Sequence, residues 1–393
     1  MRLLRSAMVM SLVLVGFASS VTASEFRTMG PRAMSMGKAS VARPSPAYAA
    51  YYNPAALGID DRGGIEMAVG VCTRDTGLSE HLDPLINAEW DTATENPSGP
   101  EAAAIIAELR QVKDTDALIV TPSAAAGVKI GPIAVGIYPS AQAVIYTHVD
   151  LVNISTAIGV PNSFTANDSR VCLQGLGLVE VPLAYGHAFK LGQSGRLGIG
   201  GSVKYIEGAT YDLREGVQMA SSEDLSERMN DADTLSSNIG VDLGILYRSE
   251  GDRLSLGLLA RNLNSPSFET VTPGESFKED AQVRAGLAYN LSEHFVCAAD
   301  IDVTANKTLV PGYTSRQLSV GIGYERKYFS LRGGATKNIE ASGSPVSFSL
   351  GTTLGSDAFH FDLAGSVSSS WENYEDYSFP VEGGLMLAIG GGW

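Results

Sequence analysis

Beyond its first 23 residues the chain has no segment of 18 consecutive apolar residues without a charge. A transmembrane helix needs about 20 such residues, so the sequence excludes a helical membrane protein. Positive charge is also scarce, with 28 Lys and Arg against 43 Asp and Glu and a net charge of −15. An acidic chain has no electrostatic reason to approach nucleic acid, and we expect no nucleic-acid partner.

Cysteine is scarce too. The chain has 3 cysteines, Cys72, Cys172 and Cys297, and they are too far apart for a CxxC pair. This spacing gives little support for a disulfide framework or a thiolate metal site. Because each cysteine lies in a strand-like run, we expect small thiols that are buried or face a barrel lumen.

The common motifs of enzyme chemistry are missing: there is no GxSxG, HExxH, P-loop or dinucleotide fingerprint. The 5 histidines have no nucleophile close by in sequence; they are His81, His148, His187, His294 and His360. We therefore expect no catalytic residue, no cofactor, no metal site and no enzymatic activity. An enzyme with a dispersed Ser/His pair is the distant alternative.

The N-terminus has the features of an export signal. Arg2 and Arg5 precede an apolar stretch from Met8 to Ala18, and Val21-Thr22-Ala23 offers the small residues that a signal peptidase reads. The apolar stretch is shorter than the ~20 residues of a membrane anchor, which disfavours that alternative. We predict a signal peptide over residues 1–23 and a mature chain from near Ser24. Removing its two arginines changes the net charge from −15 to −17.

The remainder, from residue 63 to residue 393, repeats one pattern in which apolar and small or polar residues alternate. A clear case is Ile239, Val241, Leu243, Ile245 and Tyr247, which are separated by Gly240, Asp242, Gly244 and Leu246. Alternation with a period of 2 predicts strands with one apolar face, and the 43 glycines suit many strands and turns. In a barrel that crosses lipid, the apolar face points outward.

Counting these runs predicts an all-β transmembrane antiparallel barrel of about 14 strands over residues 63–393. The runs lie near 63–73, 118–129, 133–147, 171–189, 196–211, 235–249, 253–264, 279–290, 295–304, 314–324, 328–336, 345–353, 358–369 and 380–393. Every second connection is a tight turn, such as Ile130-Gly131-Pro132, and the others are mostly longer, such as 74–117. Short periplasmic turns that alternate with long outer loops are typical of outer-membrane barrels.

A soluble β-sandwich is the alternative, since its strands would alternate as well. It does not explain the alternation of short and long connections. Nor does it explain the apolar last strand, Leu385 to Trp393, which ends on an aromatic residue. That ending resembles the C-terminal signal by which bacterial assembly machinery recognises outer-membrane barrels. We therefore expect the cell outer membrane as the location and its lipids as partners.

Residues 24–62 have no strand pattern and precede the first strand, and a barrel of 14 strands is wide enough to need a plug. The segment contains Arg32-Ala33-Met34-Ser35-Met36-Gly37 and Asn53-Pro54-Ala55. It resembles the N-terminal hatch of the FadL family of fatty-acid transporters. It is closer still to PorV-like secretion components and proteins labelled plasmid-transfer TraF. The resemblance implies that Asn53, Pro54 and Ala55 form a hatch signature inside the barrel, where Asn bonds local backbone and Pro fixes a turn.

Two functions follow from this resemblance and stay open. The first is uptake of a hydrophobic, fatty-acid-like small molecule through a plugged lumen, with charged residues on the inner face as a path: Glu180, Lys204, Asp242 and Arg284. The second is a non-transporting outer-membrane partner of secretion or conjugation proteins. The long connection 74–117 also predicts a helix from Pro100, which would cover the barrel mouth, dock a partner or pack on neighbouring loops.

Three prolines lie within the second, third and fourth predicted strands, namely Pro122, Pro139 and Pro182. Proline cannot donate to a strand ladder, and a closed barrel has no edge to accommodate it. Counting from the turn at Gly131 places Pro122 opposite about residue 140, and counting across the next loop places Pro139 opposite about residue 179. By resemblance to the FadL kink, we expect a lateral opening in this wall; harmless bulges are the alternative.

Overall fold

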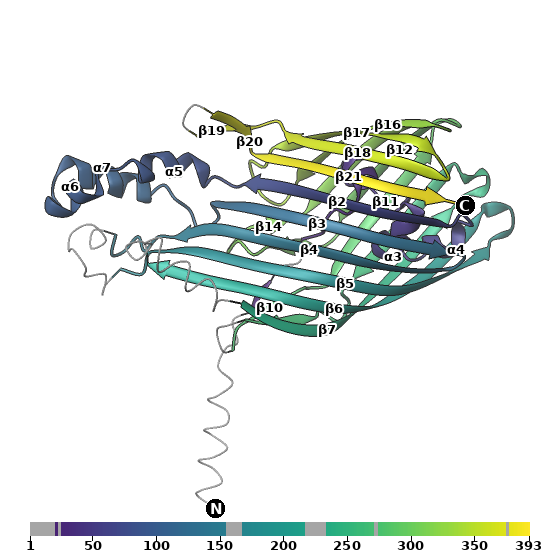
Figure 1. The fold of residues 1–393 in the computed structure, drawn as a ribbon, viewed down its shortest axis with the longest axis horizontal. Helices are drawn as coiled ribbons and strands as arrows, with labels where there is room; N and C mark the ends of the chain where they lie inside the picture. The colour runs from purple at the N-terminus through teal and green to yellow at the C-terminus, as the bar shows by residue number, and fades with distance from the viewer. Residues whose placement is uncertain (1–19, 23–24, 155–166, 217–232, 271–273, 375–376) are drawn as a thin grey trace, which may run out of the picture.

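The computed structural model describes residues 20–22, 25–154, 167–216, 233–270, 274–374 and 377–393. Its main feature is a closed antiparallel barrel of 14 strands, which confirms the predicted fold (Figure 1). The strands, in chain order, are β2 (Gly64–Asp75), β3 (Ala117–Ile130), β4 (Ile133–His148), β5 (Arg170–Lys190), β6 (Arg196–Gly216), β7 (Asp233–Arg248), β8 (Leu254–Arg261), β11 (Gln282–Asn290), β12 (Phe295–Asp302), β15 (Gln317–Arg326), β16 (Phe329–Asn338), β17 (Val346–Ser356), β18 (Phe359–Ser368) and β21 (Glu382–Gly392). The first and last of these close the barrel, with Met67 opposite Ile389.

The alternating pattern places apolar side chains outside and polar side chains inside. On β2, Met67 and Val69 are 50% and 58% exposed, whereas Glu66 and Ala68 are 5% and 6% exposed. The same outward apolar face recurs on other strands, for example at Ile199 of β6. The outside of the barrel is thus an apolar belt, as a lipid-facing wall requires. No helix in the described part of the chain is long and apolar enough to cross a bilayer.

The two ends of the barrel differ. The short connections, such as Gly131-Pro132 between β3 and β4, all lie at one end, which we call the turn end. Gly131 has a φ of 57°, a conformation that glycine adopts without strain. The C-terminal Trp393 lies at the same end, and the long connections lie at the other, the loop end (Figure 1).

A helical arm extends beyond the loop end (Figure 1). It consists of α5 (Ser79–Ile86), α6 (Trp90–Glu95) and α7 (Pro100–Leu109), of which only α7 was expected from the sequence. Ala102, Ile105 and Leu109 of α7 are buried against Ala93 of α6 and Ile154 of the next loop. The apolar face of α7 therefore packs within the arm and on a neighbouring loop, and the arm does not cover the barrel mouth.

Two loops fold into the loop end of the lumen. Short strands β9 (Ser267–Glu269) and β10 (Ser276–Lys278) form a hairpin, and β13 (Asn306–Lys307) pairs with β14 (Thr314–Ser315). A separate hairpin, β19 (Trp371–Tyr374) and β20 (Tyr377–Pro380), joins β18 to β21. Phe268, Phe277, Leu309 and Val310 are fully buried and pack on inward residues of β3 to β6. These loops thus form an apolar core against the wall of β3 to β6 at the loop end.

Strand β1 (Ser20–Thr22) pairs in parallel with β10 and lies in the segment predicted to be a signal peptide. Residues 1–19 and 23 of that predicted segment are outside the described residues.

The N-terminal segment, residues 25–62, fills the turn half of the lumen. Its elements are α2 (Pro31–Ser35), a 3-10 turn η1 (Pro46–Tyr48), α3 (Ala49–Tyr52) and α4 (Ala56–Ile59). Helix α2 contacts β16, β17, β18 and β21, whereas α4 contacts β5, β6 and β7 on another part of the wall. The segment therefore crosses the lumen from one wall to another.

Candidate functional site

The Asn53-Pro54-Ala55 motif docks directly on the inner wall. Its backbone and the Asn53 side chain lie where β-carbons would stand on four glycines, Gly186, Gly198, Gly200 and Gly244 of β5, β6 and β7. The Asn53 amide donates to the carbonyl of Val41 (3.0 Å) and to that of Ile245 on β7 (3.2 Å). Its oxygen accepts the Ala55 N–H (3.1 Å). The motif thus bonds local backbone and also joins the segment to the wall.

Buried ion pairs anchor the rest of the segment. Arg27 pairs with Glu279 at 2.9 Å, and both side chains are buried. The carboxylate of Asp300 on β12 accepts the backbone N–H groups of Ser40 (2.7 Å) and Val41 (2.9 Å). Hydrogen bonds to charged groups are stronger than neutral ones, so these contacts hold the segment in one position.

Glu25 makes the most complete of these anchors. Its two carboxylate oxygens accept from both terminal nitrogens of Arg74 on β2, at 2.7 and 3.0 Å. Burial raises the pKa of the Glu25 carboxyl, but the Arg74 guanidinium outweighs this and lowers the pKa to about 2. Glu25 is therefore ionised at neutral pH, and the pair has the bidentate geometry that favours an arginine–carboxylate contact.

Three of the four charged residues predicted on the inner face lie together. Lys204 of β6 pairs with Glu180 of β5 at 2.7 Å and with Asp242 of β7 at 3.1 Å. Arg261 of β8, whose place in the alternating pattern also predicts an inward side chain, pairs with Glu180 at 2.7 Å as well. The fourth predicted residue, Arg284 of β11, instead pairs with Asp302 at 2.5 Å. All of these side chains are at most 4% exposed, so they form paired contacts and do not line an open channel.

Aromatic residues of the N-terminal segment cover the two arginines. The Arg261 guanidinium lies 4.0 Å from the ring centre of Tyr51, and that of Arg284 lies 3.9 Å from the ring centre of Phe26. Cation–π contacts of this kind are strongest where water is excluded. No sequence pattern pointed to Phe26 or Tyr51, because each of these contacts joins residues more than 200 positions apart.

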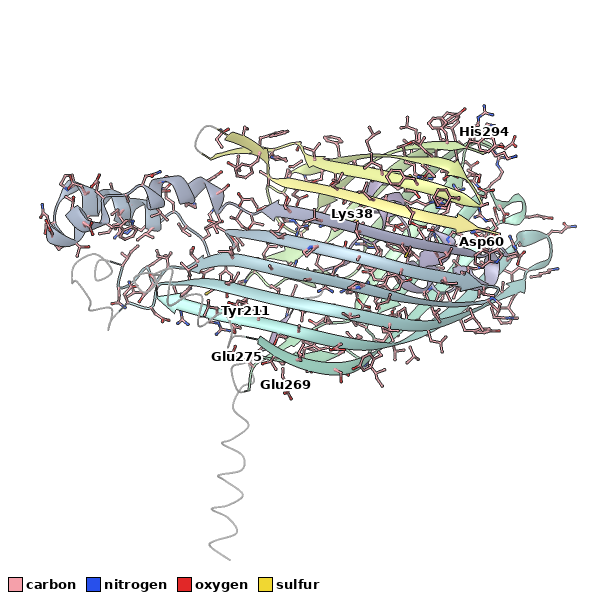
Figure 2. The ribbon with its side chains drawn as sticks, viewed as in Figure 1. Lys38, Asp60, Tyr211, Glu269, Glu275 and His294 are labelled. Atoms are coloured by element: carbon pink, nitrogen blue, oxygen red, sulfur yellow. The ribbon has the colours of Figure 1, made fainter. Side chains whose placement is uncertain are left out.

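A cavity lies between the N-terminal segment and the wall. Its lining is mostly hydroxyl-bearing and charged, and it includes Lys38, Arg74, Thr121, Ser123 and Gln142. Figure 2 places Lys38 midway along the barrel, between Asp60 at the turn end and Tyr211 towards the loop end. The cavity can therefore hold a molecule that carries a polar group.

The proline-containing wall has gaps in its ladder. Between β3 and β4, both wholly described, Val120 pairs with Ala143, Ser123 with Ser140 and Ala126 with Ile137, but the two positions between successive pairs do not pair. One gap therefore includes Pro122 and the next includes Pro139. The sequence count placed Pro122 opposite about residue 140. In the structure the residue paired with Ser140 is Ser123, one position further along β3. Pro139 lies opposite Val179, as counted from the sequence.

The β4–β5 ladder also has a gap, between Val135–Leu183 and Tyr138–Glu180, which covers Pro182. The ladder of β2 with β3 continues through Pro122, and that of β5 with β6 through Pro182. The gaps are therefore confined to the two seams on either side of β4.

A hollow of 840 Å³ lies on this wall and is lined mainly by apolar and small residues. Its lining includes Pro122, Ala124, Pro139, Ala141 and Gly177. Ser123 lines both this hollow and the internal cavity. Both spaces therefore reach the same residue of β3, next to the gaps in its ladder with β4.

Solved structures share this architecture. The Ralstonia pickettii toluene transporter TbuX is 13% identical, with a TM-score of 0.53 over 93% of this chain and 99% of the transporter. The CymD monoaromatic hydrocarbon channel is 13% identical, with a TM-score of 0.53 over 94% of this chain and 98% of the channel. The Pseudomonas putida toluene transporter TodX is 14% identical, with a TM-score of 0.50 over 94% and 99%. These likenesses confirm the FadL-type barrel fold.

No curated protein sequence matches the chain. A family model described as "F plasmid transfer operon, TraF, protein" matches residues 50–302. The match begins within the N-terminal segment, includes Asn53-Pro54-Ala55 and continues through β12. Since it spans more than half of the 393 residues, the chain belongs to this TraF family.

Proposed function

We propose that the chain, after loss of residues 1–23, resides in the outer membrane as a barrel (63–393) whose hatch (24–62) occupies the lumen. The apolar belt on the outer wall supports this location, since such a surface is unfavourable in water. Cell fractionation tests it: the mature chain should appear in the outer membrane and migrate on gels in a heat-modifiable way. Recovery as a soluble periplasmic protein would contradict the proposal.

The transport proposal is uptake of a hydrophobic small molecule that carries a polar group. A single observation carries it: Ser123, which lies between two gaps in the β3–β4 ladder, lines both the internal cavity and the lipid-facing hollow. A molecule in the cavity would have its polar group near Lys38 and Arg74 and its apolar part towards the wall. It would leave sideways between β3 and β4, past Pro122 and Pro139, into the membrane.

We propose a structural role for the charged residues on the inner face, Glu180, Lys204, Asp242 and Arg284. Glu180, Lys204 and Asp242 neutralise one another, and Arg284 is neutralised by Asp302. Buried pairs of this kind are costly to break, because each leaves an unpaired charge. We infer that they hold the hatch aromatics in place and keep the direct axial route closed. A fatty-acid-like substrate would then use the lateral route.

A second candidate function is a non-transporting partner in conjugative transfer or protein secretion. The description of the matching family, which refers to a plasmid transfer operon, favours it. The helical arm beyond the loop end provides a surface outside the barrel for a protein partner.

Purification in a mild detergent separates the two candidates. Mass spectrometry of a freshly extracted sample should find a bound amphiphile if the barrel takes up such molecules. A stoichiometric protein that copurifies, without any bound amphiphile, would support the partner function and contradict uptake.

A further inference from the structure

Three arginines converge on one carboxylate at the turn end of the lumen. Arg32 and Arg43 come from the N-terminal segment, and their Nη2 atoms lie 3.2 and 2.8 Å from the two oxygens of Glu325 on β15. The Nε of Arg332 on β16 lies 3.7 Å from the same carboxylate. One acid thus faces three guanidinium groups, and the cluster has an excess of positive charge.

The neighbouring acids are already engaged. Glu66 accepts a hydrogen bond of 2.6 Å from Ser45, and Asp362 contacts the Thr353 hydroxyl. Asp362 is 3.8 Å from Nη1 of Arg332, beyond hydrogen-bonding distance. With Glu325, these two carboxylates equal the three arginines in number, but neither of the two forms a hydrogen bond with an arginine within the described residues.

The guanidinium group of Arg332 has one hydrogen-bond donor without an acceptor among the described residues. Its Nη1 donates to Thr353 (2.8 Å), but its Nε has no hydrogen-bond acceptor among the described residues, although the side chain is only 6% exposed. The hydroxyl of Tyr48, also buried, has no partner in the same part of the chain. Buried donors without acceptors are costly, so an acceptor that reached this place would be bound favourably.

Two cavities meet at the cluster. The inner one is small and combines Arg32, Arg43, Arg332 and Tyr48 with an apolar side formed by Met29, Met36, Val296 and Ala298. The outer one, of 1240 Å³, shares the three arginines and extends to the turn end at Trp393. Among the residues that line it, six carry positive charge and four carry carboxylates. Arg332, which has an unsatisfied Nε, therefore borders a space that reaches the turn end, and this space is rich in positive charge on an otherwise acidic protein.

We propose that Arg32, Arg43 and Arg332 form a binding site for an oxyanion, a carboxylate or phosphate group that enters from the turn end. The planar guanidinium group of arginine can donate two parallel hydrogen bonds to a carboxylate or to a phosphate. The oxyanion belongs either to a small free ion or to the head group of an amphiphile. The proposal of this site does not rest on uptake or on a lateral opening. An experiment can therefore contradict the site without contradicting the proposed function, and the reverse.

The test uses the purified full barrel in a non-ionic detergent, titrated with inorganic phosphate and with dodecyl phosphate and followed by phosphorus NMR. We expect saturable binding that weakens about tenfold or more in the Arg32→Gln/Arg43→Gln double variant, which removes two charged donors. Glu325→Gln should tighten binding, because the internal anion that competes for the arginines is removed. Heat-modifiable migration verifies that each variant is folded.

The charge-matched control is Arg110→Gln/Arg253→Gln, which removes two exposed arginines distant from both cavities. Its binding should equal that of the unchanged barrel. Binding of both probes supports a site for small free oxyanions, and binding of dodecyl phosphate alone supports a site for an amphiphile head group. The proposal is overturned if neither probe binds, if the Arg32/Arg43 variant binds as well as the unchanged barrel, or if the control loses binding equally.

Discussion

The side-chain oxygen of Asn53 occupies the place where a β-carbon of Gly244 would stand. Gly244 is an inward position of β7, and the close approach brings the Asn53 amide within reach of the Ile245 carbonyl. A wall residue with any side chain would hold the N-terminal segment away from β7. The fit between one asparagine and one glycine therefore sets how closely the segment docks on the barrel.

Replacing Gly244 by Ala should consequently loosen this docking. An added methyl group in a close-packed contact costs about 1–3 kcal/mol, and we expect a lower melting temperature and faster proteolysis within residues 25–62. Gly333→Ala on β16 is the matched control, since the nearest atom to its β-carbon would be the Ser349 carbonyl oxygen at 3.8 Å. Equal melting temperatures for the two variants would show that Asn53 is not tightly seated.

The alternation of apolar and small residues was sufficient to predict the barrel, because a strand with one lipid face imposes a period of 2 on every pass. The same pattern could not identify the docking surface. Gly200 and Gly244 satisfy the alternation as any small lumen residue would, and nothing local shows that Pro54 and Asn53 lie against them.

The arginine cluster was unpredictable for a related reason. Arg32 and Glu325 are 293 positions apart, and strand patterns say nothing about how a non-strand segment is placed within the lumen. The short helices α5 and α6 were missed because each is at most 8 residues long and α5 contains Pro84, so neither gives a clear helical repeat.

Deleting residues 24–57 should leave a barrel that still inserts but passes small polar solutes more freely. The barrel strands pair with one another without help from this segment, whereas the lumen at the turn end is filled by it. Liposome swelling with a small sugar measures the change, and the unaltered barrel is the reference. Equal swelling rates would mean that the loop-end core alone closes the lumen.

The Glu25–Arg74 pair should make the stability of the barrel depend on pH. The pKa of Glu25 is lowered from its ordinary value of 4.5 to about 2, so ionised Glu25 favours the folded state. This contribution is fully present above about pH 4.5 and is lost as pH falls through about 2. Glu25→Gln should therefore lower the melting temperature at pH 7 and have little effect near pH 2.

Melting curves at both pH values, read from heat-modifiable gel migration, measure this difference. Glu293→Gln is the control, because Glu293 is exposed in a turn between β11 and β12. If Glu25→Gln and Glu293→Gln behave alike at pH 7, the Glu25 pair does not stabilise the fold.

The last prediction concerns the wall around β4. Pro139 points outward into the hollow, and as a proline it has no N–H to donate to a neighbouring strand. An unpaired backbone group that faces lipid costs several kcal/mol, so a gap in this ladder is a weak place in the wall.

Pro139→Val restores the donor, and valine suits a strand. We expect the ladder between β3 and β4 to close and uptake of an apolar probe to fall. Pro345→Val, just before β17 and away from the gap, should leave uptake unchanged. If Pro139→Val closes the ladder by hydrogen exchange at residues 121–125 and uptake is the same, molecules do not leave through this wall.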